Sequence, residues 1–258
     1  MKRRNLILDF SYSYPTKLEN SKEFTWIECS DIEECSMFCE KSAEEEIRKR
    51  IRPYGPSGIH FIDSGDYHYV TKFFVDFIKE PFSLVLIDHH TDMQKPMMEG
   101  MLSCGNWARK LLEENEFLQQ LVLIGPEREA CVHLDMKNKE KILCILYEDL
   151  EADDGRSEII EIRNDIPIYL SIDKDVLRKT AAKTNWNQGF MTLGMLEYLI
   201  GFLFLKREVI GMDICGEYKK SGLFPEYAEA LRLNTNTNEE IYEYVMDLLR
   251  VHHADRLG

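Results

Sequence analysis

The stretch from Ser83 to Asp92 constrains the fold of this chain most strongly. Residues 83–87 form a short apolar run of strand-favouring side chains, typical of a strand buried on both faces of a sheet. The run ends abruptly in Asp88-His89-His90-Thr91-Asp92. Side chains alternate along an extended backbone, so we expect Asp88, His90 and Asp92 to share one side. Carboxylates and imidazoles that converge in this way predict a divalent metal site.

A second stretch, residues 168–175, repeats the pattern. Its apolar run Ile168–Asp173 also ends in two carboxylates, Asp173 and Asp175, spaced two residues apart. In parallel sheets, ligands bind beyond the carboxyl ends of the strands. We therefore expect the two strand ends to form the halves of one metal site.

Short strand-like runs recur along the whole chain. Eight are expected, at Leu6–Phe10, Phe24–Cys29, Gly58–Asp63, Ser83–His89, Leu121–Ile124, Ile142–Tyr147, Ile168–Asp173 and Val209–Ile214. Helical patterns lie between several of these runs, and strands that alternate with helices imply parallel crossovers. The predicted fold class is α/β, a three-layer α/β/α arrangement with an eight-stranded, mostly parallel sheet.

Five helices are expected from apolar spacing and end signals. Ser42 and Glu45 form a capping box that opens a helix closed by Pro53. The others are expected around Phe73–Ile78, around Trp107–Leu112, at Leu193–Lys206, and at Glu239–His252 with Asn238 as its N-cap.

The length of 258 residues fits a single large domain, expected over residues 1–258. No repeat or flexible linker divides the chain, and the acidic stretch Glu151–Gly155 is expected to be a surface loop.

The chain is acidic, with 32 basic and 46 acidic residues and a net charge of −14. This charge argues against nucleic acid and anionic membranes as partners. It suits a small-molecule substrate, and a cationic one in particular. Assembly into a homo-oligomer stays open.

The seven cysteines are scattered and odd in number, so we expect reduced thiols rather than a disulfide framework. The basic start leads into an apolar run, Leu6–Leu8, that is too short for a signal peptide, and no segment is long enough to span a bilayer. A cytoplasmic location is expected.

A further histidine follows the third predicted strand, in Gly65-Asp66-Tyr67-His68. It completes a set of six oxygen and nitrogen donors: His68, Asp88, His90, Asp92, Asp173 and Asp175. Four carboxylates balance the charge of two divalent cations, and this donor set favours Mn²⁺ over structural zinc. Two such ions acidify a bridging water to a pKa of ~7, which predicts hydrolysis.

The patterns D-x-H-x-D and S-x-D-x-D, at Asp88–Asp92 and Ser171–Asp175, resemble those of the arginase/agmatinase (ureohydrolase) family. The resemblance implies an eight-stranded parallel sheet and a binuclear manganese centre. It also implies that Asp88, His90, Asp92, Asp173 and Asp175 are ligands, and that the reaction is C–N hydrolysis of a small guanidino, amidino or amide compound. Asp92 would hydrogen-bond the attacking hydroxide as well as bind metal.

Three departures from that family alter the expected substrate. His68 has one extra residue before it, relative to the family's G-G-D-H stretch. The stretch Gly100–Trp107 lacks the family's proton-shuttling histidine, and Glu217 lies one place later than the family's guanidinium-binding glutamate. Arginase activity itself is therefore less expected than C–N hydrolysis of a related substrate. Candidate substrate-contacting residues, chosen by position, are Asn106, Trp107, Trp186, Gln188 and Glu217, and Glu217 is also a candidate catalytic residue.

Other interpretations stay open. Asp173 and Asp175 also fit the D-x-D pattern of haloacid-dehalogenase-like phosphatases, although that pattern normally opens its fold. A single-zinc deacetylase of related fold would use Asp88, His90 and Asp173. A metal-binding relative without catalysis would keep the ligands alone. We expect His60 to be a core residue, His89 to pack away from the site, and His133, His252 and His253 to lie on the surface.

Overall fold

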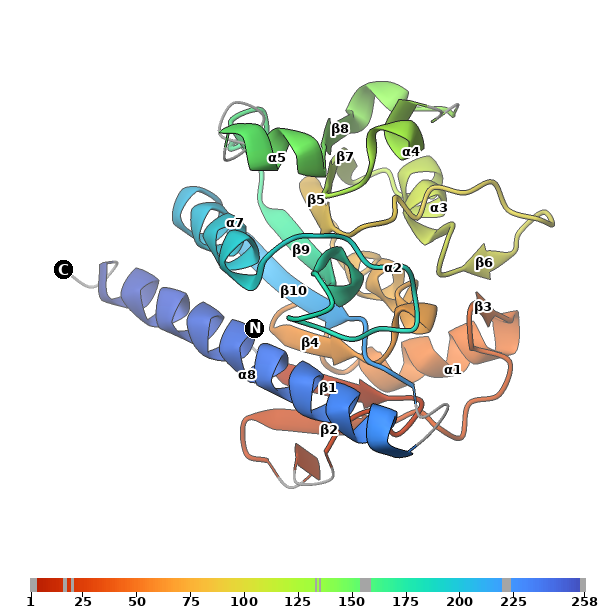
Figure 1. The fold of residues 1–258 in the computed structure, drawn as a ribbon. Helices are drawn as coiled ribbons and strands as arrows, with labels where there is room; N and C mark the ends of the chain where they lie inside the picture. The colour runs from red at the N-terminus through yellow and green to blue at the C-terminus, as the bar shows by residue number, and fades with distance from the viewer. Residues whose placement is uncertain are drawn as a thin grey trace.

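A computed structural model describes residues 4–15, 18–19, 21–132, 134, 136–153, 159–219 and 224–255, without the side chains of 152–153 and 252–255. Its centre is one sheet of eight strands in the order β2-β1-β4-β10-β9-β5-β7-β8 (Figure 1). Every pairing in this sheet is parallel. The strands are β1 Asn5–Asp9, β2 Phe24–Glu28, β4 Ile59–Ile62, β5 Phe82–Ile87, β7 Leu118–Ile124, β8 Ile142–Ile145, β9 Ile168–Asp173 and β10 Val209–Cys215. The predicted eight-stranded α/β fold is confirmed.

Strands β5 and β9 lie side by side although about eighty residues separate them in sequence. Their register pairs Leu86 with Ser171 and Ile87 with Ile172. The next residues are Asp88, just after β5, and Asp173, the last residue of β9. The parallel register itself therefore brings these two carboxylates together at the carboxyl ends of the strands.

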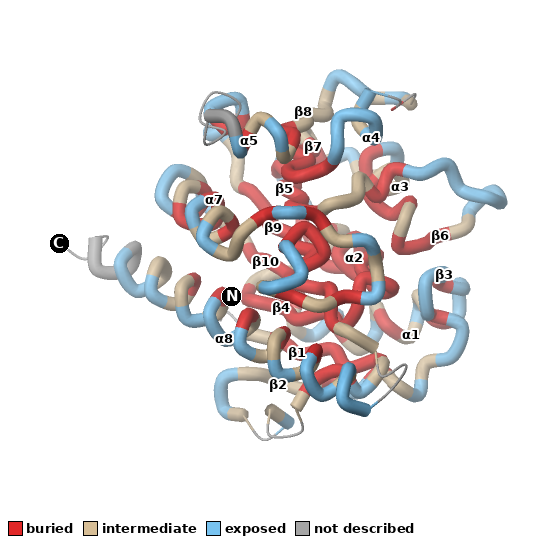
Figure 2. Tube along the Cα trace, in the orientation of Figure 1, coloured by how far each residue is buried: buried red, intermediate tan, exposed pale blue. Residues whose placement is uncertain are grey.

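Strand β5 is buried on both faces, as its composition predicts. Leu84 and Leu86 pack in one apolar core, with side chains of α1 (Lys41–Ile51), α2 (Val70–Val75) and α3 (Trp107–Glu114). Val85 and Ile87 pack in a second core, with α5 (Tyr147–Asp153), α7 (Leu193–Lys206) and α8 (Phe224–Asp255). Helices therefore cover both faces of the sheet, and the central strands are buried along their length (Figure 2).

The remaining elements are short. They are α4 Arg128–Val132, the 3₁₀ turns η2 Gly65–Tyr67, η3 Lys139–Lys141 and η4 Lys174–Val176, and a two-stranded antiparallel sheet of β3 Phe38–Cys39 and β6 Leu102–Ser103. The small sheet was not predicted, because two-residue strands have no detectable alternation. None of the described helices is both long enough and apolar enough to cross a bilayer.

Three local predictions were wrong. Helix α1 begins at Lys41 after Glu40, and no side chain caps it, so Ser42 does not form the predicted capping box. Helix α8 begins at Phe224, so Asn238 lies inside it and is not its N-cap. The first part of the acidic stretch, through Asp153, is helical in α5, and residues 154–155 lie outside the described residues.

The close approach of β10 to the turn before β4 generates a stability prediction. A Cβ added at Gly211 would lie 1.9 Å from the Pro56 carbonyl oxygen, whereas one added at Gly194 in α7 meets no atom within 4 Å. We expect Gly211→Ala to lower the free energy of unfolding by about 1–3 kcal/mol through overpacking. Gly194→Ala should be neutral or stabilising by up to about 1 kcal/mol. Urea unfolding of both variants checks this, and equal effects would contradict it.

Candidate metal centre

His68 is held so that one ring nitrogen is fixed and the other faces the site. It follows the η2 turn, and its backbone N–H donates to the Gly65 carbonyl oxygen over 3.1 Å. Its Nε2 lies 2.9 Å from Ser171 Oγ, and that hydroxyl donates to Asp213 Oδ1 over 2.6 Å. Thr71 Oγ1 donates to the same Asp213 oxygen over 3.0 Å. This chain places a proton on Nε2 and leaves the Nδ1 lone pair available as a ligand.

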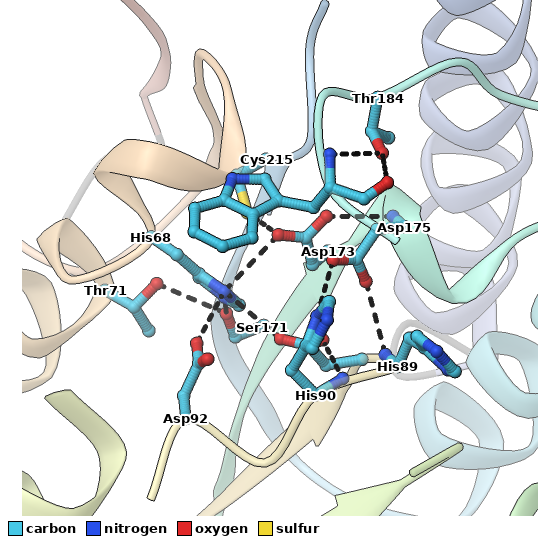
Figure 3. A network of polar contacts seen from close by, with 12 residues as sticks. His68, Thr71, His89, His90, Asp92, Ser171, Asp173, Asp175, Thr184 and Cys215 are labelled. Carbon is cyan, nitrogen blue, oxygen red and sulfur yellow. Dashed lines mark hydrogen bonds and ion pairs between the residues drawn. The ribbon is translucent and has the colours of Figure 1, made fainter. Parts of the chain in front are cut away.

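Three carboxylates surround Nδ1 of His68. Nδ1 lies 3.1 Å from Asp92 Oδ2, 3.3 Å from Asp88 Oδ2 and 3.6 Å from Asp173 Oδ2. Figure 3 shows His68, Asp92 and Asp173 pointing toward one another from three separate segments. We call these four donors, His68, Asp88, Asp92 and Asp173, group A. All four side chains are at least nine-tenths buried.

A second set of donors lies around His90, and Asp88 belongs to both sets. Nδ1 of His90 lies 2.8 Å from Asp175 Oδ2 and 3.6 Å from Asp88 Oδ1. We call His90, Asp88 and Asp175 group B. Oδ2 of Asp88 thus faces group A while its Oδ1 faces group B. Asp88 is therefore the carboxylate that the two groups share.

The segment after β5 converges for a different reason from the one we predicted. The strand ends at Ile87, and Asp92 has a left-handed backbone with φ +51°. Strand alternation therefore does not align Asp88, His90 and Asp92. A left-handed non-glycine residue costs about 1–2 kcal/mol, and the start of α3 holds it in place. Trp107 Nε1 donates to Asp92 Oδ2 over 2.5 Å, and the Ala108 N–H donates to the Asp92 carbonyl oxygen over 3.2 Å.

Like charges crowd this site. Burial and the charge of Asp88 raise the pKa of Asp92 to about 6, and the same two causes raise the pKa of Asp173. Burial followed by Asp173 and Asp88 raises the pKa of Asp175. Burial acts to lower the pKa of His90, but Asp175 and Asp88 outweigh it and raise this pKa to about 12. Four buried carboxylates clustered around two imidazoles call for cations, so the donor set fits divalent metal ions.

Two thiols adjoin these donors. Cys215 Sγ donates to Asp173 Oδ2 over 3.1 Å, which leaves Asp173 Oδ1 to accept the Asp175 N–H over 2.8 Å. Cys104 lies in the cavity wall, and burial followed by the charge of Asp92 raises the pKa of its thiol to about 12.

A cavity of about 260 Å³ opens over both groups. All six predicted ligands lie in its wall, so the structure brings them together. The other described lining residues are Met37, Phe38, Gly65, Gln94, Lys95, Met97, Ser103, Cys104, Gly105, Asn106 and Trp186. Residues 37–38 and 94–97 were missed in the sequence, because nothing in these loops signals a shared cavity.

Some of the predicted substrate-contacting residues line the cavity and others do not. Asn106 and Trp186 line the cavity. Trp107 is fully buried and bonds Asp92, and Gln188 Nε2 donates to the carbonyl oxygens of Leu177 and Ala182 over 3.0 Å each. Trp107 and Gln188 thus support residues around the cavity and do not line it.

Glu217 also points away from the cavity. It is 2% exposed, and its Oε1 accepts from Lys174 Nζ and from Asn238 Nδ2. Lys174 is itself fully buried, between the donors Asp173 and Asp175 in sequence. The structure therefore makes Glu217 a buried ion-pair partner of Lys174.

The other histidines do not line the cavity in the described part of the structure. His60 is buried and stacks on Phe74 with ring centroids 4.3 Å apart, as expected for a core residue. His89 contributes its backbone N–H to Asp175, and its ring lies close to Gly189. His133 and the side chains of His252 and His253 lie outside the described residues.

A larger cavity of about 490 Å³ lies between α8 and the first strands. Its described lining includes aromatic side chains, carboxylates and Arg250, but no histidine or cysteine. The chemistry therefore points to the smaller cavity.

Comparisons with known proteins place the chain as a whole. A family model described as "Arginase family" matches residues 8–216. An uncharacterized protein of Thermotoga maritima is 33% identical over 160 residues, covering 62% of this chain and 58% of its own length. The chain thus aligns with little more than half of that relative.

Solved structures show the same fold at low identity. Proclavaminate amidino hydrolase from Streptomyces clavuligerus has a TM-score of 0.64 at 14% identity, covering 94% of this chain and 91% of its own. Trypanosoma cruzi formiminoglutamase with Mn²⁺ has a TM-score of 0.59 at 13% identity, covering 90% and 91%.

The hydrogen bond from Trp107 to Asp92 generates a prediction on metal affinity. Trp107→Phe keeps an aromatic ring but removes the donor that orients Asp92. We expect affinity for Mn²⁺ to fall about 10–100-fold, the usual effect of losing a partner that orients a ligand. Trp186→Phe is the control, since its Nε1 donates to Asp66, which is not a ligand. Calorimetric titration measures both, and unchanged affinity in Trp107→Phe would contradict the orienting role.

The buried pair of Lys174 and Glu217 generates a prediction on stability. Lys174→Met leaves the Glu217 carboxylate buried without its cation, which should cost about 3–5 kcal/mol. The double variant Lys174→Met/Glu217→Gln removes both charges and should recover much of that loss. Denaturant unfolding of the metal-free proteins tests this. A double variant less stable than the single one would rule out the pairing role.

Proposed function

The chain belongs to the arginase family, and we propose that it is a hydrolase that uses two divalent metal ions to cleave a C–N bond in a small amidino, guanidino or amide compound. The observation that carries this proposal is the division of Asp88 between two donor groups, with Oδ2 toward His68 and Oδ1 toward His90. One carboxylate with an imidazole facing each of its oxygens is an arrangement that a single ion does not need.

The residues divide between the two ions as follows. His68, Asp88, Asp92 and Asp173 would hold the first ion, and Asp88, His90 and Asp175 the second. Mn²⁺ suits this donor set of carboxylate oxygen and imidazole nitrogen. When bound, a pair of such ions makes hydroxide available at neutral pH and stabilises negative charge on the substrate.

The protein itself supplies positioning and proton transfer. Trp107 fixes Asp92 Oδ2, so the Asp92 carboxylate is held rigidly in the cavity wall. We assign to Asp92 the acceptance of the proton of the attacking water and its delivery to the leaving nitrogen. Trp186 and Phe38 line the cavity above the donors and limit the access of bulk water.

The recognition residues favour a substrate other than arginine. The cavity wall near residue 104 offers Ser103, Cys104 and Asn106, with no histidine in that segment. Glu217, the candidate for binding a guanidinium group, is engaged by Lys174. Metal chemistry is therefore retained in a cavity whose contacts to substrate differ.

The single-zinc deacetylase interpretation has less support. That chemistry uses adjacent histidines as acid and base beside the metal. Here His90 belongs to group B, and His89 is not among the described lining residues of the cavity. The count of ions per chain separates the two interpretations.

Metal analysis combined with an activity screen tests the proposal. After loading with Mn²⁺ and removal of free metal, we expect two ions per chain, a raised melting temperature, and hydrolysis of at least one amidino, guanidino or amide compound, followed by the urea, ammonia or free amine released. Asp175→Asn should lose one ion and Asp88→Asn both, because Asp88 serves both groups. Asp66→Asn, outside the donor set, should retain two. A protein without stoichiometric metal would refute the proposal.

A further inference from the structure

The charge of the cavity wall is the starting point. Within the six donors, two divalent cations would balance the charge of the four carboxylates. Outside them, the described lining residues include one charged side chain, Lys95. The rest of the wall is apolar, with Met37, Phe38, Met97 and Trp186, or polar without charge. With both ions bound, the charged side chain left to contact the substrate beyond the metals would be the cation Lys95.

The carboxylates that follow β4 and β10 near the donors, Asp66 and Glu217, are both engaged by other side chains. Glu217 is engaged by Lys174 and Asn238. Asp66 accepts from Trp186 Nε1 over 3.0 Å, from Ser36 Oγ over 2.9 Å and from Lys219 Nζ over 2.7 Å. Neither side chain lines the cavity.

A glycine, Gly216, stands at the place where the family has its guanidinium-binding glutamate. Gly216 precedes Glu217 at the end of β10 and has a left-handed backbone with φ +92°. A Cβ there would lie 2.6 Å from Asp173 Oδ1. A longer side chain at this position would displace a ligand, so the site has no room for an acidic group at that point.

The backbone fixes the position from which Lys95 reaches the cavity. Asp92 is held at the start of α3, and the Gln94 N–H donates to the Gly105 carbonyl oxygen over 2.9 Å. The Gln94 side chain packs on Gly105, where an added Cβ would lie 3.0 Å from it. Lys95 follows directly. It is exposed at the rim and forms no ion pair with the described residues.

We infer that the substrate carries an anionic group of the carboxylate class, and that Lys95 binds this group while the C–N bond lies over the metal ligands. The inference rests on the proposed function, because it places the C–N bond at the metal centre. A cavity of about 260 Å³ is small for a ligand site, so both groups belong to one small molecule. Lys95 is thus a specificity-determining residue.

Two matched series of probes separate tail charge from the reacting group. The guanidine series is 4-guanidinobutyrate, butylguanidine and agmatine, whose tails are anionic, neutral and cationic. The amide series is N-formyl-4-aminobutyrate, N-butylformamide and N-formylputrescine. Binding to the Mn²⁺-loaded protein is measured by calorimetry or by competition, and hydrolysis in parallel. In at least one series we expect the anionic member to bind roughly fivefold tighter than the neutral one, the effect of one partly exposed ion pair, and the cationic member to bind most weakly.

Variants then assign the preference to Lys95. Lys95→Gln should remove the roughly fivefold advantage of the anionic probe, and Lys95→Glu should reverse the order in favour of the cationic probe. Raising the ionic strength should reduce the wild-type preference. Lys206→Gln is the control. Lys206 is exposed at the end of α7, just before β10, at the opposite edge of the sheet from the cavity, and its loss changes the net charge equally.

The other possible results contradict either the role of Lys95 or the proposed function. If neither series shows a preference for the anionic member, or if Lys95→Gln keeps that preference, Lys95 is a surface lysine only and the inference is overturned. Metal content is measured on the same samples. Two bound ions with hydrolysis but no anion preference would refute this inference and leave the proposed function standing. Absence of bound metal would refute both.

Discussion

The parallel pairing of β5 with β9 is the constraint on which the rest of the structure depends. Because Ile87 pairs with Ile172, the next residues lie side by side, Asp88 just after β5 and Asp173 as the last residue of β9. A shift of one residue would turn one of these side chains toward the opposite face. The apolar side chains of β5, with Leu86 in one core and Ile87 in the other, fix that register. Hydrophobic packing on two faces thus sets the geometry of charged groups at the edge.

Concentrating buried carboxylates at one edge costs free energy, and the surrounding residues offset it. Ser171 and Asp213 fix the His68 ring, Trp107 holds Asp92, and Cys215 donates to Asp173. Buried charge is tolerated where it is hydrogen-bonded and paired. Most of these partners come from strands or helices, so the donors are held by the rigid part of the fold.

The sequence predicted the sheet and the six donors because both depend on local patterns. Apolar runs identified β5 and β9, and the polar residues at their ends identified the site. The direction of a side chain outside a strand is not local information. Trp107, Gln188 and Glu217 were therefore placed near the cavity by position, although their side chains turn to Asp92, to backbone carbonyls and to Lys174. Lys95 gave no signal, because a lysine in a polar loop resembles any surface residue. Helix α8 was predicted too short, since the run Asn234-Thr235-Asn236-Thr237-Asn238, made of weak helix formers, lies inside it.

The rim of the cavity is built from different segments than its floor. The donors follow β4, β5 and β9, whereas the rim comes from residues 37–38, 94–97 and 103–106 together with Trp186. Residues 94 and 105 are joined by a backbone hydrogen bond, which does not depend on the identity of either side chain. Selectivity and reactivity are therefore separable in this architecture. Exchanging rim side chains would change which charged molecules the cavity admits while the donor set on its floor stays intact, which makes the protein a practical scaffold for engineering.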